Sequence, residues 1–280
     1  MNLTSPVLDS VTQRIFIGDG NGVLHFVRLS PSDLCTGSVA APCVDSTTLS
    51  LSSGTHAIID APIVDSANQK IFAFLQDNGS GHYTLTQADT SFGIPVTVPL
   101  GANTGAAAHI GAFDNAYFSF TGTGTNNGHL YVCGTEGINP NPGSAALYRV
   151  GFTGATMNST SSDGPLQLVT SGSAGCSPLT EFFNPNASGG TEFLFVSVTA
   201  NCSATLGASG CIRAFNITGG FPADTASAPT VAEDGGTSGI VVDNVNLSSG
   251  ASSIYFSTQA DAVKNVTGSN AIKLTQSGLQ

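Results

Sequence analysis

At 280 residues, the chain is long enough to bury a sizeable core, as one large β domain or two small ones. Only 9% of its residues are charged, and 7 Lys plus Arg against 18 Asp plus Glu give a net charge of −11. This balance excludes nucleic acid and anionic membranes as partners, because phosphate groups need clustered Lys and Arg. The 34 Gly and the abundance of Ser, Thr, Asn and Val argue against long helices and favour short strands joined by turns.

The first predicted strands lie in the segment SPVLDSVTQRIFIG, which begins at Ser5 and is nearly repeated as APIVDSANQKIFAF 56 residues later. Each copy has Pro, an apolar pair, an Asp-Ser step, a basic residue and then an apolar run. The acid-ended strand recurs three more times, as IGAFDN, SPLTEF and GIVVDN. The acidic residues of the five copies are Asp9, Asp65, Asp114, Glu181 and Asp243.

An apolar strand and then an alternating strand follow each of these segments. The apolar strands are RIFIGDG, KIFAFLQ, HLYVCGT, EFLFVSV and SIYFSTQ, and the alternating strands are VLHFVRL, HYTLTQA, ALYRVGF, CIRAFNI and AIKLTQS. A weaker fourth strand follows in most units. Because inner strands covered on both faces are continuously apolar and half-exposed outer strands alternate, five such units predict an all-β propeller of four-stranded antiparallel blades. We expect one domain over 1–280, with blades near 5–54, 55–104, 105–172, 173–234 and 235–280.

The segments SPVLDSVTQRIFIGDGNGVLHFV and APIVDSANQKIFAF resemble blades of secreted bacterial β-propeller repeat proteins of the PQQ-like and YVTN-like type. The later segments GAFDNAYFSF, GHLYVCGTEG, GCSPLTEFFNP and GGTSGIVVDN resemble the closing blades of uncharacterised members. The resemblance implies the geometry of a blade and no activity. Members that bind pyrroloquinoline quinone typically have eight blades, a Trp-rich motif and a calcium site, whereas this chain has 0 Trp. We therefore expect no cofactor, with calcium as the open alternative.

The last predicted blade raises the question of how the ring closes. Its third strand ends near the C-terminus, and MNLT at the N-terminus is a poor candidate for a closing strand. Three alternatives are open: residues 1–4 complete the last blade, the natural chain continues upstream, or another protomer donates a strand. Because an open sheet edge is a template for strand addition, self-assembly is a physical hypothesis.

Six cysteines in a chain of this composition predict three disulfides. Cys35 and Cys43 are close in sequence, as are Cys202 and Cys211, which leaves Cys133 to pair with Cys176. Free buried thiols are the alternative, whereas a zinc site lacks CxxC spacing and supporting His.

Cysteine usage, scarce Lys and a polar uncharged surface favour an extracellular protein. Sequons also begin at Asn2 and Asn78, and the candidate glycosylation sites are Asn158, Asn186, Asn201, Asn216, Asn246 and Asn265. MNLTSPVLDS lacks the basic and apolar regions of a signal peptide, so we expect a secreted precursor whose signal was removed or truncated. No apolar run approaches the length of a membrane span.

The repeated acidic residue has two interpretations. In the first, Asp9, Asp65, Asp114, Glu181 and Asp243 line a central channel, where they bind a cation, or bind or cleave a carbohydrate. In the second, which we favour, each acid caps the turn of its own hairpin through an Asx-type hydrogen bond. The turn sequences GDGNG and QDNGSGH likewise predict tight hairpin turns and not calcium loops.

Other candidate functional residues are few. The five histidines show no i, i+2 or i, i+4 cluster; a weak metal-site alternative places His56 and His109 near the channel mouth with Asp60 and Asp114. Tyr117, Phe182 and Phe183 are the candidates for exposed aromatic rings on which a ligand would stack. No GxSxG, HExxH or glycine-rich phosphate loop is present. The sequence predicts a non-catalytic structural or binding module, with copies of itself, another extracellular protein or glycans as partners.

Overall fold

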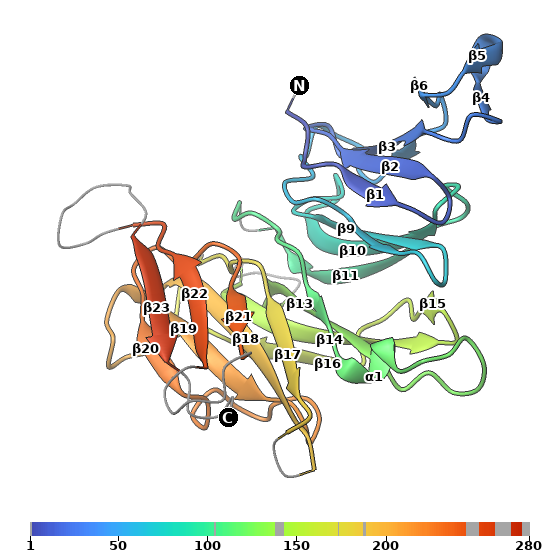
Figure 1. Ribbon diagram of the computed structural model, residues 1–280. Helices are drawn as coiled ribbons and strands as arrows, with labels where there is room; N and C mark the ends of the chain where they lie inside the picture. The colour runs from blue at the N-terminus through green and yellow to red at the C-terminus, as the bar shows by residue number, and fades with distance from the viewer. Residues whose placement is uncertain are drawn as a thin grey trace.

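The protein consists of antiparallel sheets that follow one another along the chain (Figure 1). The computed structural model describes residues 2–103, 105–137, 143–172, 174–186, 189–244, 252–260 and 270–275. Within these ranges the helical elements are α1 (Asn115–Phe118) and the 3-10 turn η1 (Thr36–Ser38). The all-β class predicted from the sequence is confirmed. No described helix is both long and apolar enough to cross a membrane.

Four of the five main sheets are formed from strands that are consecutive in the sequence, sheet 1 is interrupted by a two-stranded ribbon, and all pairings are antiparallel. Sheet 1 contains β1 (Val7–Asp9), β2 (Arg14–Gly18) and β3 (Val23–Arg28), with β6 (Cys43–Val44) and β7 (Leu49–Ser50) both paired to β3. Sheet 2 contains β8 (Ile63–Asp65), β9 (Lys70–Leu75), β10 (His82–Asp89) and β11 (Val96–Ala102). A separate ribbon joins β4 (Leu34–Cys35) to β5 (Val39–Ala40).

The remaining sheets repeat the same order of strands. Sheet 3 contains β12 (Ala112–Phe113), β13 (His129–Thr135) and β14 (Ala145–Thr153), with β15 (Thr156–Met157) and β16 (Asp163–Gln167) both paired to β14. Sheet 4 contains β17 (Thr180–Asn184), β18 (Thr191–Ala200), β19 (Ser209–Asn216) and β20 (Thr230–Ala232). In sheet 5 the described strands are β21 (Val241–Asp243), β22 (Ser253–Ser257) and β23 (Ala271–Thr275).

Four buried clusters hold the sheets together, one between each successive pair. Buried residues on the two sides of these interfaces are Phe16 and Leu75 between sheets 1 and 2, Phe72 and Val150 between sheets 2 and 3, Leu147 and Val196 between sheets 3 and 4, and Phe195 and Ile254 between sheets 4 and 5. Each such side chain contributes about 2 kcal/mol of hydrophobic stabilisation when it is removed from water.

The inner strand β9 is apolar without interruption from Ile71 to Leu75 because both of its faces are covered. In β9, Phe72 and Phe74 face sheet 3, whereas the intervening Ile71, Ala73 and Leu75 face sheet 1. Side chains alternate between the two faces of a strand, so a sheet placed between two others needs an apolar residue at every position.

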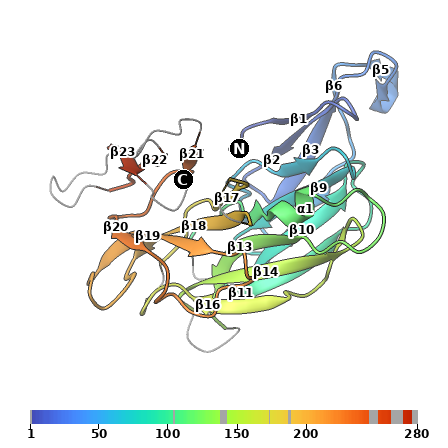
Figure 2. The ribbon, with the colours of Figure 1, turned by 60° about the horizontal axis from the view of Figure 1, so that its bottom comes forward.

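The five sheets follow a curve, and sheet 5 lies at the opposite end of this curve from sheet 1 (Figures 1 and 2). Among the described residues, no strand pairing and no buried cluster joins sheet 5 to sheet 1. The N-terminus instead extends sheet 1, because Leu3 bridges Asp19 and the Gly20 N–H donates to the Asn2 carbonyl. Residues 2–4 therefore belong to sheet 1, and none of them pairs with a described strand of sheet 5.

The structure contains three disulfides, in the pairs that the spacing of the cysteines predicts. Cys35–Cys43 closes the excursion that carries β4 and β5, and Cys202–Cys211 joins β19 to the loop before it. Cys133–Cys176 differs from these two because it crosses between sheets. Cys133 lies on β13 of sheet 3, whereas Cys176 bridges Val198 on β18 of sheet 4.

We expect removal of the inter-sheet disulfide to destabilise the fold more than removal of the Cys35–Cys43 disulfide. The two bonds close chain segments of 43 and 8 residues, respectively. Loop entropy then predicts losses of about 4 and about 2.5 kcal/mol in the free energy of unfolding. Urea denaturation of the Cys133→Ala/Cys176→Ala and Cys35→Ala/Cys43→Ala variants measures both losses. Equal losses, or a larger loss for the second variant, would contradict the expectation.

Candidate functional site

The acidic residues at the first two sheet corners bind the backbone of their own turns. Asp9 is fully buried and accepts hydrogen bonds from the N–H groups of Val11 and Thr12. Burial by itself raises the pKa of this carboxyl, but hydrogen bonds, the largest from Ser66 and Thr12, hold the pKa below its usual value. Asp65 similarly accepts the backbone N–H of Asn68 at 3.0 Å and its side-chain amide at 2.7 Å.

The third corner is linked to the second through Tyr117. Asp114 caps α1 by accepting the Tyr117 N–H at 2.9 Å, and it also accepts the His129 N–H at 2.9 Å. The Tyr117 hydroxyl donates to Asp65 at 2.5 Å, while its ring stacks on Phe113 with centroids 4.1 Å apart. Tyr117 is only 6% exposed, so the prediction of an exposed ring is wrong.

The corner of the fourth unit is Asn184 and not Glu181. At the corners of sheets 1 and 2, the last residue of the first strand pairs with the first residue of the second strand, as Asp65 pairs with Lys70. In sheet 4 the corresponding pair is Asn184 and Thr191. Asn184 is fully buried, and its side-chain oxygen accepts the N–H of Asn186. The strand continues for three residues beyond Glu181, so the assignment of Glu181 as the corner acid is wrong. In sheet 5, Asp243 occupies the corner opposite Ser253.

Glu181 lies instead beside a second carboxyl between sheets 3 and 4. Burial, together with a hydrogen bond and charge repulsion from Glu192, raises the pKa of Glu181 far above its usual value. Glu192 in turn accepts the backbone N–H of Asn115. Two ionised carboxyls in contact repel each other, and this repulsion favours the neutral form of Glu181. In the described ranges, no group of three or more His, Cys, Asp or Glu side chains is arranged to hold a metal.

Four histidines each lie beside a different aspartate and form no common site. The nitrogen–oxygen distances are 3.0 Å for His25–Asp19, 3.9 Å for His56–Asp77, 2.9 Å for His109–Asp60 and 2.9 Å for His129–Asp114. His109 lies beside Asp60, as the metal-site alternative requires. His56 lies beside Asp77 and Asp114 lies beside His129, so the four residues of that alternative do not form one site. Asp19 also accepts the N–H groups of Asn21 and Val23, which makes GDGNG a hairpin turn as predicted.

The other candidate residues lie apart from one another. Phe182 and Phe183 are half-buried; Phe182 packs against the cluster between sheets 4 and 5. Among the candidate glycosylation sites, Asn186 and Asn216 are exposed, whereas Asn158 and Asn201 are half-buried. Asn246 and Asn265 lie outside the described residues.

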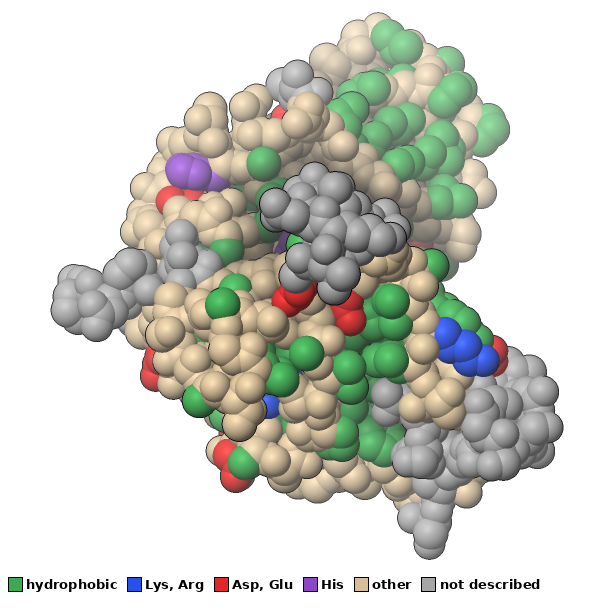
Figure 3. All heavy atoms as spheres, turned by 90° about the vertical axis from the view of Figure 1, so that its left-hand side faces the viewer, with side chains coloured by type: hydrophobic (Ala, Val, Ile, Leu, Met, Phe, Trp, Pro, Cys, Tyr) green, Lys and Arg blue, Asp and Glu red, His purple; other side chains and the backbone are tan. Residues whose placement is uncertain are grey.

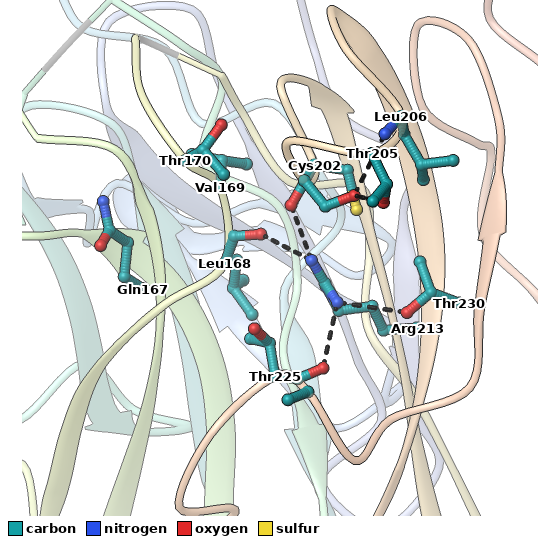
Figure 4. A pocket seen from close by; sticks show the side chains of 12 residues that line it. Gln167, Leu168, Val169, Thr170, Cys202, Thr205, Leu206, Arg213, Thr225 and Thr230 are labelled. Carbon is teal, nitrogen blue, oxygen red and sulfur yellow. Dashed lines mark hydrogen bonds between the residues drawn. The ribbon is translucent and has the colours of Figure 1, made fainter.

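A cavity of about 510 Å³ lies at the outer strands of sheets 3 and 4 (Figure 4). Its wall is formed by the segment after β16, the loop from Cys202 to Leu206, and residues on and before β20. Arg213 of β19 points into the middle of these segments and is 5% exposed. Its Nη2 donates to the Cys202 carbonyl at 2.7 Å and the Leu168 carbonyl at 3.5 Å, and its Nη1 donates to the Thr225 carbonyl at 3.2 Å and the Thr230 hydroxyl at 3.1 Å.

The positive charge of Arg213 has no carboxylate partner among the described residues. None of the ion pairs includes it, and burial alone lowers the pKa of its guanidinium. Its Nε is buried and has no acceptor in the part of the chain that the structure describes. Sequence reasoning missed this residue, although one signal was available: the arginine in CIRAFNI is followed by a fourth strand, TVA, that carries no acid.

Two kinds of polar arrangement therefore occur in this protein. The acids at the corners of sheets 1, 2 and 3 bind the turns beside them, whereas Arg213 faces a cavity with an unbalanced charge. No protein-family model matches the chain, and no curated protein matches it either. The role of each arrangement has to be inferred from its own chemistry.

We expect Glu181→Gln to stabilise the protein at pH 8 and to have much less effect at pH 5. The folded pKa of Glu181 lies above its unfolded value, so folding takes up a proton and the wild type loses stability as pH rises through this range. Glutamine retains the hydrogen bond and does not ionise, which predicts a gain of about 1 to 2 kcal/mol at pH 8.

Thermal unfolding at both pH values measures this gain. Glu136→Gln is the control, because it makes the same substitution at an exposed residue. A gain in unfolding temperature that is the same at pH 5 and pH 8 would show that Glu181 is not the group that titrates.

Proposed function

We propose that this chain is a secreted, non-catalytic β-propeller module with a structural or binding role, which associates with copies of itself through its two end sheets. The observation that carries the proposal is the pair of outward faces on sheets 1 and 5. Every other main-sheet face is covered by a neighbouring sheet, whereas these two are not covered in the part of the chain that the structure describes.

The outward face of sheet 1 carries an apolar row that crosses four strands. In register, Leu8 pairs with Ile15, Ile15 with Val27, and Val27 with Val44. Leu8 is 59% exposed and Val44 is 66% exposed. In Figure 3, apolar side chains gather on the distant upper part of the molecule, which is the N-terminal region of Figure 1. Exposed apolar patches of this kind are typical of interaction surfaces.

The outward face of sheet 5 carries a second row at the other end of the molecule. In register, Val241 pairs with Tyr255, and Tyr255 pairs with Lys273, whose ammonium lies 5.6 Å from the centre of the tyrosine ring. Val241 is 64% exposed. A second copy that places its sheet 1 on this face would repeat the face-to-face packing found inside the molecule. Because the two faces differ, such contacts are head-to-tail and lead to rings or filaments.

Several further observations support the propeller architecture and the location. Five consecutive sheets stacked on a curve are what blades of a propeller require, and their strand order fits the resemblance to secreted bacterial repeat proteins. Three disulfides fit an oxidising extracellular setting. The alternative of glycans bound by channel carboxylates has less support, because Asp9, Asp65 and Asp114 bind their own turns.

We expect the wild-type protein to associate in solution and Val241→Glu to be monomeric or nearly so. The substitution places a charge where an apolar face has to lose its water, while the opposite face of sheet 5 remains packed on sheet 4. Association is expected to strengthen with salt, because copies with a net charge of −11 repel one another and salt screens that repulsion.

Sedimentation velocity over a range of protein and salt concentrations measures the association. The matched control is Ile94→Glu, which adds the same charge at a residue that is 95% exposed and lies between β10 and β11 of sheet 2. A wild-type protein that stays monomeric at every concentration would refute the assembly.

A further inference from the structure

Three arginines lie on the third strand of their sheets, and two of them have a carboxylate partner. Arg28 on β3 forms an ion pair with Asp45, and Arg149 on β14 forms one with Asp163 through both Nε and Nη2. Arg213 on β19 is the most deeply buried of the three guanidinium groups, and it is the one without such a partner in the described ranges.

The strand register shows where the missing carboxylate would lie. Arg149 stands directly opposite Asp163 on β16, and Arg213 stands directly opposite Thr230 on β20. The side chains of such a pair are neighbours on one face of the sheet. Sheet 4 therefore places a threonine at the position where sheet 3 places the counter-ion of its arginine.

Thr230 and the backbone carbonyls do not replace that counter-ion. They accept hydrogen bonds from Nη1 and Nη2, but they carry no net charge and leave Nε without an acceptor. A buried charge is normally paired, and a buried donor without an acceptor is uncommon. Arg213 lines the cavity of about 510 Å³, a size within the range of small-molecule sites.

The wall of this cavity fits a small molecule that has hydroxyl groups as well as a charge. Leu168 and Val169 provide apolar surface next to Arg213, while Gln167, Thr205 and Thr225 provide polar atoms around them. The contact from Nη2 of Arg213 to the Leu168 carbonyl is long at 3.5 Å, so a carboxylate in the cavity can take the place of this carbonyl as the acceptor. A hydrogen bond between a guanidinium and a carboxylate is shorter and stronger than one to a neutral carbonyl.

We infer that the cavity binds a small polyhydroxylated acid of hexuronate size, whose carboxylate supplies the counter-charge that Arg213 lacks. The site lies on the outer strands of sheets 3 and 4, and it uses neither end face. It is therefore independent of the proposed self-association, and either one can fail without the other.

The test compares Thr230→Asp with Thr230→Asn in titration calorimetry with sodium galacturonate. Aspartate at 230 places a carboxylate opposite Arg213, as Asp163 lies opposite Arg149, so we expect galacturonate to bind this variant at least tenfold more weakly and its unfolding temperature to rise. Asparagine has the same shape and no charge, so we expect it to bind galacturonate within about threefold of the wild type. Galactose, in which a hydroxymethyl group stands in place of the carboxylate, is expected not to bind.

Each result bears directly on the inference. Absence of galacturonate binding to the wild type, equal binding to Thr230→Asp, or binding of galactose as tight as that of galacturonate would overturn it. Sodium chloride at matched ionic strength controls for general anion effects. A shift of the wild-type unfolding temperature with galacturonate and not with galactose is a second readout, which does not depend on whether the variants fold.

Discussion

The structure depends on one constraint: an antiparallel sheet that is apolar on both faces must be covered on both faces. Sheets 2, 3 and 4 meet this condition through neighbours on each side, and the four buried clusters are the result. The same condition explains why β9, β13 and β18 each contain a run of consecutive buried residues, at 71–75, 130–135 and 194–198. It also explains why the two end sheets are of interest, since each keeps a row of side chains on a face that its own chain does not cover in the described ranges.

The polar groups at the sheet corners satisfy a second requirement, which is to end each strand without leaving backbone N–H groups unpaired. Asp9, Asp65 and Asp114 accept these N–H groups, and Asn184 does the same in the fourth unit with an amide oxygen. Acids engaged in this way have few lone pairs left for a substrate or a cation. The repeated acid therefore stabilises the turns of the fold.

Arg213 illustrates the opposite situation, a charge that the fold buries and does not balance. Burying a cation without a counter-ion costs free energy, and the comparison with Arg149 and Asp163 shows that a single residue on the neighbouring strand would supply the balance. A binding module tolerates this cost when a ligand restores the balance. The proposed ligand site and the end faces lie on different parts of the molecule, so the two proposed roles do not compete for the same surface.

The sequence by itself determined the all-β class, the order of strands within each sheet and the pairs of cysteines. The strand order depends on segments that are close along the chain, and the pattern of apolar residues reports it directly. Two of the cysteine pairs are local as well, and the third, Cys133–Cys176, follows because no other cysteines remain. Only the tertiary structure decided that Asn184 and not Glu181 forms the fourth corner, because the end of a strand is set by pairing and not by the presence of an acid. It also decided that Tyr117 is buried against Phe113, that residues 2–4 extend sheet 1, and that Arg213 faces a cavity. The physical reason is the same for the burial of Tyr117 and the setting of Arg213: segments distant in sequence create these environments, and no local pattern records which of them will meet.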